Sequence, residues 1–175
     1  MESRRLPVIL ERGGSLLAYI LPLVEAIYFF GARIFLYPND TNLKIFFLKY
    51  LQGIVLFYQS NMYLCFGLTI TIFMICTNNS IPIIGTKLPL TRFIRMNVVQ
   101  AVLVQVFITC IGQVFLISPN FIKNSVLGTF IANGCFFAIV GLVLYSAFLI
   151  ALGRYPRIPI ITESARLQTW AGENR

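Results

Sequence analysis

Long stretches without a charged residue dominate the chain, and their lengths predict helices that cross a membrane. Arg95 and Lys123 are separated by 27 uncharged residues, and Lys123 and Arg154 by another 30. A helix needs about 20 apolar residues to cross the hydrocarbon layer of a bilayer. The sequence therefore predicts two spans in the second half of the chain, at about residues 97–117 and 126–152.

Two less regular spans are predicted in the first half. The first, at about residues 16–35, contains Pro22, Glu25 and Arg33. The second, at about residues 61–77, has an apolar core of only 14 residues, so it needs its flanking residues to cross. The first span has no small-x-small cleavage site, and we expect it to be retained, with no cleavable import signal.

Residues 45–58 mix aromatic and aliphatic side chains with lysine and glutamine. This pattern favours a helix that lies in the membrane interface. A longer, tilted continuation into the span at 61–77 is the alternative. The expected fold is an all-α integral membrane protein with four transmembrane helices and an interfacial helix between the first two, in a single membrane domain, residues 1–175.

The connections in the second half also follow from local chemistry. Pro119 and Asn120 lie between the third and fourth spans, which predicts a turn and a tight antiparallel hairpin. Pro156 and Pro159 each bias the preceding residue away from helix, so the exposed tail at 153–175 should begin with an extended segment. A short solvent-exposed helix is expected after it.

Composition and charge agree with a membrane protein and suggest an orientation. The chain is 58% hydrophobic and 11% charged, a balance that one soluble core of this size could not bury. With four spans, both termini and the middle loop share a side. That side carries ten basic residues and the other side four: Arg4, Arg5, Arg12, Lys87, Arg92, Arg95, Arg154, Arg157, Arg166 and Arg175 against Arg33, Lys44, Lys49 and Lys123. The positive-inside rule then places both termini in the cytoplasm or its organellar equivalent.

Several kinds of chemistry are excluded. There is no histidine, which removes the usual haem and zinc ligands and the base of a Ser-His-Asp set. Asp40 is the sole aspartate, so a two-aspartate intramembrane protease is impossible. Glycine-rich phosphate loops are missing. The four cysteines contain no C-x-x-C pair and are expected to be free thiols: Cys65, Cys76, Cys110 and Cys135. We therefore expect no enzyme, metal or cofactor.

Glu25 is the sharpest candidate for function. A carboxylate inside a span is costly and usually faces a bundle interior, a partner charge or a water-filled path. Arg33 is eight residues away, too far for a neighbour on the same helix. An ion pair with Arg92 or Arg95 is the first expectation, and a direct transport role is the alternative. The two arginines lie at the mouth of the third span, where they can also anchor to lipid phosphates.

The third span carries a polar stripe. Ala101, Gln105, Thr109 and Gly112 lie on one helical face, with Gln113 at its border. Amides and hydroxyls in lipid commonly bind neighbouring helices, so interhelical contacts are the first interpretation. The wall of a polar path is the second.

The fourth span has a face of small residues. Gly134, Ala138 and Gly141 lie on it beside Asn133. Small side chains allow two helices in lipid to approach closely. We expect this face to pack against another helix.

Three segments together resemble the twenty-kilodalton Tic family, the membrane core of the protein translocon at the inner chloroplast envelope, with relatives in cyanobacteria. They are SLLAYILPLVE at 15–25, RFIRMNVVQAVL at 92–103 and GRYPRIPIITE at 153–163. The likeness runs in register over residues 15–168. The positions that match the family are Pro22, Glu25, Arg92, Arg95, Asn97, Gln100, Pro156, Arg157 and Pro159.

The resemblance implies a four-helix, multi-pass protein of the plastid inner envelope membrane, with both termini stromal. It implies a path for unfolded preproteins, formed with other translocon subunits among membrane lipids and without nucleic acid. Residues 45–58 match the family poorly. The lack of a transit peptide fits a plastid-encoded or cyanobacterial member. A small-solute or proton-coupled transporter built on Glu25, and a structural subunit of a membrane complex, are the alternatives.

Overall fold

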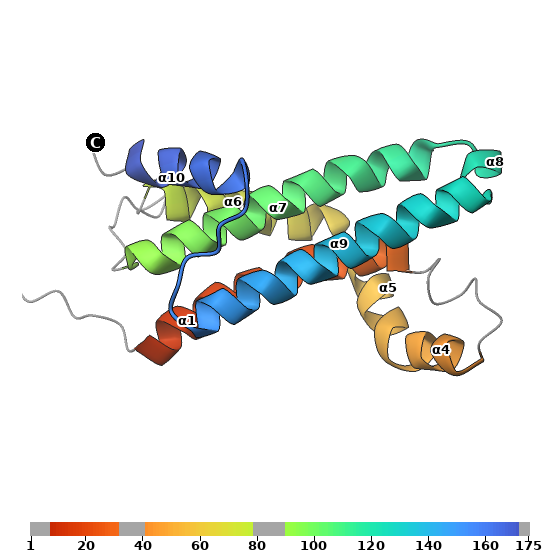
Figure 1. Cartoon of the computed structure of the whole chain (residues 1–175), viewed down its shortest axis with the longest axis horizontal. Helices are drawn as coiled ribbons and strands as arrows, with labels where there is room; N and C mark the ends of the chain where they lie inside the picture. The colour runs from red at the N-terminus through yellow and green to blue at the C-terminus, as the bar shows by residue number, and fades with distance from the viewer. Residues whose placement is uncertain (1–7, 32–40, 79–89, 172–175) are drawn as a thin grey trace, which may run out of the picture.

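The computed structural model describes residues 8–31, 41–78 and 90–171, which form helices joined by turns and one extended segment (Figure 1). The helices are α1 (Val8–Ala18), α2 (Ile20–Ala26), η1 (Ile27–Gly31), α4 (Thr41–Phe46), η2 (Phe47–Leu51), α5 (Gln52–Ser60), α6 (Met62–Asn78), α7 (Arg92–Ile117), α8 (Asn120–Lys123), α9 (Val126–Ala151) and α10 (Ile161–Ala171). The elements η1 and η2 are π-helical.

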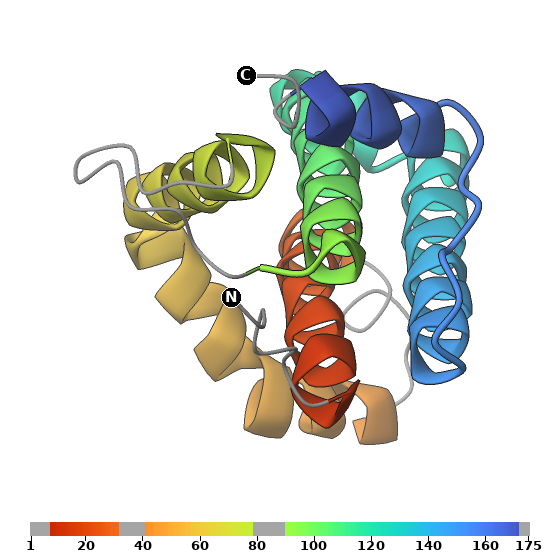
Figure 2. The ribbon, with the colours of Figure 1, turned by 90° about the vertical axis from the view of Figure 1, so that its left-hand side faces the viewer.

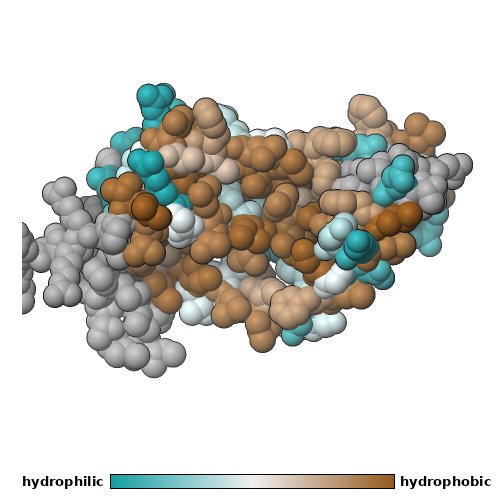
Figure 3. Space-filling model, turned by 90° about the horizontal axis from the view of Figure 1, so that it is seen from below, coloured by the Kyte–Doolittle hydropathy of each residue, from teal (hydrophilic) through white to brown (hydrophobic). Residues whose placement is uncertain are grey.

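Three helical stretches are long and apolar enough to cross a membrane: Val8–Gly31, Arg92–Ile117 and Val126–Ala151. The bent pair Leu48–Ser60 and Met62–Asn78 adds a fourth if it counts as one span. Apolar side chains cover much of the face in Figure 3, as expected for a surface in contact with lipid. The expected all-α membrane fold is confirmed.

The first span is a broken helix. Pro22 has no N–H to bond the carbonyl of Ala18, and α1 ends there, with the Tyr19 N–H bonded to the Leu16 carbonyl over 3.0 Å. After Tyr19 the chain continues as α2 and η1. The helix begins at Val8, before the predicted start of the span at residue 16, and the predicted end at 32–35 lies outside the described residues.

The second apolar segment bends sharply at Asn61. The axes of Leu48–Ser60 and Met62–Asn78 differ by 79°, so one straight, tilted helix over both segments is wrong. The break frees backbone groups, and the Asn61 side-chain amide bonds the Phe57 carbonyl over 3.0 Å. Helix α6 then runs alongside α7, while α4 and α5 extend in another direction (Figure 1). The interfacial position of residues 45–58 stays a prediction.

Helix α7 is the centre of the molecule. It packs against α1, α2, α6, α10 and η1. Its residues 94–102 are all buried. In Figure 2, α6 lies on one side of α7 and α9 on the other. The predicted tight hairpin is wrong in one respect, because α1, α2 and η1 pack against both α7 and α9 and separate much of their length.

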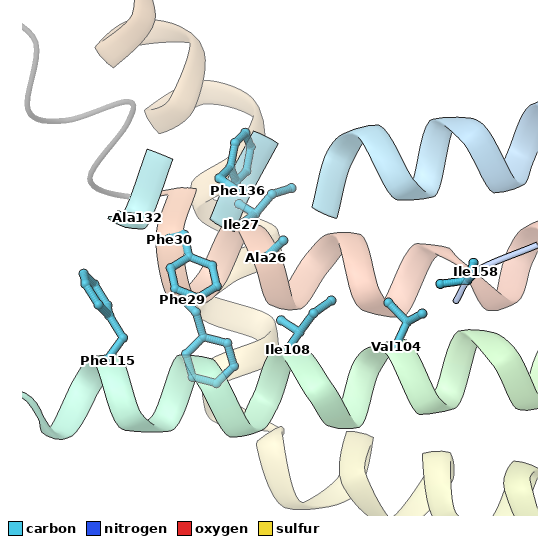
Figure 4. Packing of buried hydrophobic residues seen from close by; sticks show 10 residues of the cluster. All are labelled: Ala26, Ile27, Phe29, Phe30, Val104, Ile108, Phe115, Ala132, Phe136 and Ile158. Carbon is cyan, nitrogen blue, oxygen red and sulfur yellow. The ribbon is translucent and has the colours of Figure 1, made fainter. Parts of the chain in front are cut away.

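A hydrophobic cluster lies where the first span meets α7 and α9. Figure 4 shows Phe29 and Phe30 pointing from η1 into the space between these helices. The Phe30 and Phe115 ring centroids are 5.6 Å apart. Phe136 of α9 closes the same cluster. These aromatic contacts join the three helices near the end of the first span.

Gly153 ends α9 and sets the direction of the tail. Its φ of 74° is a left-handed conformation that glycine adopts at little cost. The Gly153 and Arg154 N–H groups bond the carbonyls of Ile150 and Leu149 over 2.9 and 2.8 Å, the pattern of a Schellman motif. The following residues, 154–158, are extended, as the two prolines predict.

Helix α10 is more buried than expected. It packs along the first turns of α7 and against α6, with Ala165 and Thr169 at 0% and 1% exposure. Its small inward residues allow this close approach, while Leu167 on the opposite face is 70% exposed. The expectation of a fully solvent-exposed helix is wrong for this face.

The start of α1 and helix α10 lie at the same end of the bundle (Figure 1). At this end the Arg12 guanidinium donates to the Ala151 carbonyl at the end of α9 over 2.7 Å. Five of the basic residues used in the charge count lie outside the described residues: Arg4, Arg5, Arg33, Lys87 and Arg175. The side of the membrane on which this end lies stays a prediction.

Candidate functional site

A buried carboxylate lies in the second half of the first span. Glu25 is one turn after Pro22 in α2, and only 2% of it is exposed. Its helix packs against α7, α9 and, more lightly, α5. The side chain therefore faces protein, as intramembrane carboxylates usually do.

Three neutral side chains donate hydrogen bonds to Glu25. The Tyr58 hydroxyl of α5 and Nε2 of Gln105 in α7 donate to Oε1 over 2.5 and 2.8 Å. The Thr109 hydroxyl donates to Oε2 over 2.7 Å. Both carboxylate oxygens thus have partners, which offsets the cost of removing them from water.

Gln105 extends this network to a fourth segment. While its Nε2 binds Glu25, its Oε1 lies 3.2 Å from the Thr69 hydroxyl of α6, which shares its proton between this oxygen and the Cys65 carbonyl at 2.9 Å. Gln105 and Thr69 are 3% and 2% exposed. We call the five residues Glu25, Tyr58, Thr69, Gln105 and Thr109 the Glu25 cluster. It joins the first span, α5, α6 and α7 at one point.

The ion pair expected for Glu25 is not found within the described residues. Arg95 binds backbone carbonyls instead, and no salt bridge in the described part of the chain involves Glu25. Three neutral donors provide the partners that an arginine would have supplied. Gln113, predicted at the border of the stripe, is partly buried one turn beyond Thr109 and does not bind Glu25.

An aromatic ring of η1 packs against α7 one turn beyond Thr109. Phe29 lies one turn after Glu25, and Gly112 lies one turn after Thr109. A Cβ atom placed on Gly112 would come within 2.3 Å of Phe29 Cγ. The glycine of the predicted stripe thus provides space for Phe29, and the two helices meet closely there.

Arg95 forms a second buried polar contact, near the start of α7. Its Nε donates to the Cys76 carbonyl over 2.8 Å, and its Nη2 to the Thr77 and Thr169 carbonyls over 3.1 and 3.2 Å. These carbonyls belong to the last turns of α6 and α10, where backbone oxygens lack helical partners and carry partial negative charge. Arg95 therefore caps two helices at once, and it is too buried, at 3% exposure, for the lipid anchoring expected of it.

Gln100 fixes the tail to α7. Its Nε2 donates to the Thr162 hydroxyl over 2.9 Å and to the Pro156 carbonyl over 3.2 Å. The Thr162 hydroxyl also accepts from the Ile158 N–H over 2.7 Å. These bonds hold the extended segment and the first turn of α10 against the central helix.

Almost all the residues that form these contacts lie in the part of the chain that matches the model of one protein family. The family model described as chloroplast import apparatus Tic20-like matches residues 7–165. The chain belongs to this family.

Individual relatives agree with this family assignment. The chain is 30% identical over 160 residues to the Tic20 family protein Ycf60 of Gracilaria tenuistipitata var. liui, covering 91% of this chain and 76% of the relative. It is 29% identical over 163 residues to Ycf60 of Cyanidium caldarium, covering 93% and 75%. It is 29% identical over 161 residues to the Tic20 family protein of Synechocystis sp., covering 90% and 92%. No solved structure is significantly similar to the chain.

Membership of the Tic20-like family supports a role in a Tic-type protein import apparatus. The positions that carried the resemblance lie in two settings. Pro22, Glu25, Arg95, Asn97, Gln100 and Pro156 are buried, whereas Arg92, Arg157 and Pro159 are exposed. The Asn97 amide donates to the Phe93 carbonyl of its own helix over 2.9 Å. Of these positions, four take part in contacts between α7 and its neighbours: Glu25, Arg95, Gln100 and Pro156.

Two members of the Glu25 cluster were missed by the sequence patterns. Tyr58 lies at the end of the segment predicted to be interfacial, and Thr69 lies in an apolar span. A buried carboxylate needs hydroxyl or amide donors, so hydroxyl side chains in neighbouring apolar segments were the available signal. Nothing in the spacing shows which of these hydroxyls meets Glu25.

The small-residue face of α9 does not pack as predicted. Gly134, Ala138 and Gly141 are exposed, and a Cβ atom on either glycine would meet nothing within 4 Å. Helix α9 instead buries a face that includes Ala132, Phe136 and Val143. This face is exposed because α9 contacts the rest of the bundle along one side only (Figure 2).

The cysteines and acids offer no metal site in the described part of the chain. No three His, Cys, Asp or Glu side chains gather there in a way that could hold an ion. Cys65, Cys76, Cys110 and Cys135 are free thiols.

Proposed function

We propose that this chain is a subunit of a protein-import translocon in a plastid inner envelope membrane, where it helps to form the path for unfolded preproteins. Its family and its apolar helices support this function. The excess of basic residues on one side supports termini that face the stroma. Its partners would be other translocon subunits, membrane lipids and the preprotein itself.

The Glu25 cluster is the observation that supports a polar path most directly. An extended chain presents an N–H and a C=O at every residue, and these groups need partners in a membrane. Glu25, Gln105 and Thr109 offer both acceptors and donors within the bundle. In this structure they bind one another, so the path would be closed here and would open by separation of the helices.

Four helices with so few interior polar groups enclose little space for a peptide. The buried polar side chains lie in pairs and small clusters and not in a continuous lining. A path shared with partner subunits is therefore the arrangement that we propose. The energy for movement would come from a separate motor protein.

Site-specific crosslinking during import tests this proposal. A photoreactive side chain at Gln105 should label a trapped preprotein, whereas one at Leu116, which is on the same helix and 41% exposed on its outer surface, should label mainly lipid or partner subunits. Equal labelling of the preprotein from both positions would refute the polar path. No labelling from either would favour a structural subunit.

A second function is favoured by one observation. Glu25 is buried among neutral donors with no ion-pair partner in the described residues, a setting also used by proton-coupled transporters. This function predicts that the purified chain moves a solute or protons in liposomes and that Glu25→Gln stops the movement. If liposomes with and without the chain have equal fluxes, this alternative fails.

A further inference from the structure

Helices α4, η2, α5 and α6 form an arm at one side of the molecule. We call residues 41–78 the arm, and the three long helical stretches at 8–31, 92–117 and 126–151 the core. Within the described residues, α6 meets the core mainly through α7, and α5 meets it through η1 and α2. Figure 2 shows the arm to one side of the core, opposite α9.

The arm presents a narrow buried face to the core. The buried residues of α6 are Cys65, Thr69 and Cys76, while apolar side chains such as Leu64 and Phe66 are 58% and 51% exposed. In lipid, exposed apolar side chains provide no force that drives a helix toward its neighbours. The attachment of α6 therefore depends heavily on polar contacts.

These polar contacts lie at two levels along α6. At the first level, the Tyr58 hydroxyl of α5 binds Glu25, and the Thr69 hydroxyl in the middle of α6 binds Gln105. Near its end, Arg95 binds the Cys76 and Thr77 carbonyls. The bend at Asn61 lies between Tyr58 and Thr69, so the first level includes the point where the arm changes direction by 79°.

We propose that the Glu25 cluster is a latch that holds the arm closed against the core. Release of Tyr58 and Thr69 from Glu25 and Gln105 would let the first part of α6 move away, while Arg95 holds its other end. A gap would open between α2 and the arm, lined by Glu25, Gln105 and Thr109.

This inference rests on the proposed function and adds a condition for opening. Separated in lipid, the donors and acceptors of the cluster would lack partners, which favours the closed arrangement. An extended polypeptide segment supplies N–H groups for Glu25 and carbonyl groups for Tyr58 and Gln105. The substrate that the latch fits is thus an unfolded chain, whose backbone can replace the bonds that the cluster gives up.

Thiol labelling of the full chain in liposomes tests the latch without any preprotein. Native Cys65 is 9% exposed, lies on the buried face of α6 and serves as the reporter. The other cysteines are replaced by alanine. Tyr58→Phe removes the bond from the arm to Glu25, and Tyr63→Phe, at a side chain 92% exposed in the same arm, is the matched control. A water-soluble maleimide should label Cys65 about tenfold faster in Tyr58→Phe than in the parent or the control, the effect of a lost hydrogen bond to a charged acceptor.

A second reporter separates opening from unfolding. In a chain that keeps only Cys135, the thiol lies on α9, which packs against α1, α2 and η1 of the core. Faster labelling of Cys65 alone supports the latch. Unchanged labelling of Cys65, or an equal rise at Cys65 and Cys135, overturns it. If the latch opens but Gln105 never crosslinks to a preprotein, the proposed function fails while the latch stands.

Discussion

At the scale of single residues, two positions on α7 show how a polar stripe becomes a contact. Gln105 links Glu25 to Thr69 through the two ends of its amide, so one side chain connects three helical segments. Gly112 contributes by packing instead of hydrogen bonding: because it has no side chain, the ring of Phe29 can lie against α7 there. The interhelical contacts predicted from the stripe thus combine hydrogen bonding with close packing.

Gly112→Ala should destabilise the chain by about 1–3 kcal/mol, the usual cost of extra volume in a packed interior. The added methyl group would lie 2.3 Å from Phe29 Cγ. Gly134→Ala is the matched control, because its methyl group meets nothing within 4 Å and alanine favours helix. Thermal unfolding in detergent, followed by circular dichroism, measures both changes. Equal stability of the two variants would contradict the packing described for Phe29.

At the scale of elements, basic side chains of other segments cap the carboxyl ends of the helices. Arg12 binds the end of α9, Lys123 donates to the Leu116 carbonyl of α7 over 2.8 Å, and Arg95 binds the ends of α6 and α10. Cations at helix carboxyl ends are favourable because the backbone carbonyls there carry partial negative charge. Residues counted for topology also fasten helices to one another.

Arg95→Met should loosen α10 from α7 and α6. The substitution keeps much of the aliphatic volume but removes every hydrogen bond that the guanidinium donates to Cys76, Thr77 and Thr169. Hydrogen bonds from charged groups contribute about 1.5–3 kcal/mol, so trypsin should cleave after Arg166 in α10 about tenfold faster.

Arg154→Met is the control for this experiment, because Arg154 is exposed in the extended segment. It should leave the rate of cleavage after Arg166 unchanged. Mass spectrometry of the released C-terminal peptide gives the rates. If both variants are cleaved at the parent rate, Arg95 does not hold α10 in place.

At the scale of the whole molecule, the chain forms a three-helix core with a bent arm beside it. The core contains the three stretches that are clearly long enough to cross a membrane. The arm supplies the fourth crossing if its bent pair acts as one span. The assignment of ten basic residues to one side of the membrane and four to the other requires this fourth crossing. With an odd number of crossings, the two chain ends would lie on opposite sides.

Single cysteines at Arg154 and Asn120 test this topology in a chain without its native cysteines. Both positions are exposed, and they follow and precede α9, respectively. In sealed vesicles of known orientation, an impermeant maleimide should label Arg154→Cys from the stromal side and Asn120→Cys from the other side. A third cysteine in place of Arg12 should share the side of Arg154. Labelling of Arg12→Cys from the side of Asn120 would refute four crossings.

The local sequence pattern alone predicted the long helices α7 and α9 and the extended segment that follows them. Charge-free runs predicted α7 and α9, two prolines predicted the extended segment after Gly153, and the rarity of an intramembrane carboxylate singled out Glu25. These inferences succeeded because they depend on the hydropathy, length and backbone chemistry of neighbouring residues.

Only the tertiary structure decided which side chains meet. Glu25 and Thr109 are 84 positions apart, and Arg95 and Thr169 are 74 apart. In a membrane protein, lipid-facing and buried positions are both apolar, so the pattern of α9 could not reveal that its small-residue face is the outer one. The partners of Glu25 and the docking of α10 follow from how the helices pack, which hydropathy along the chain does not specify.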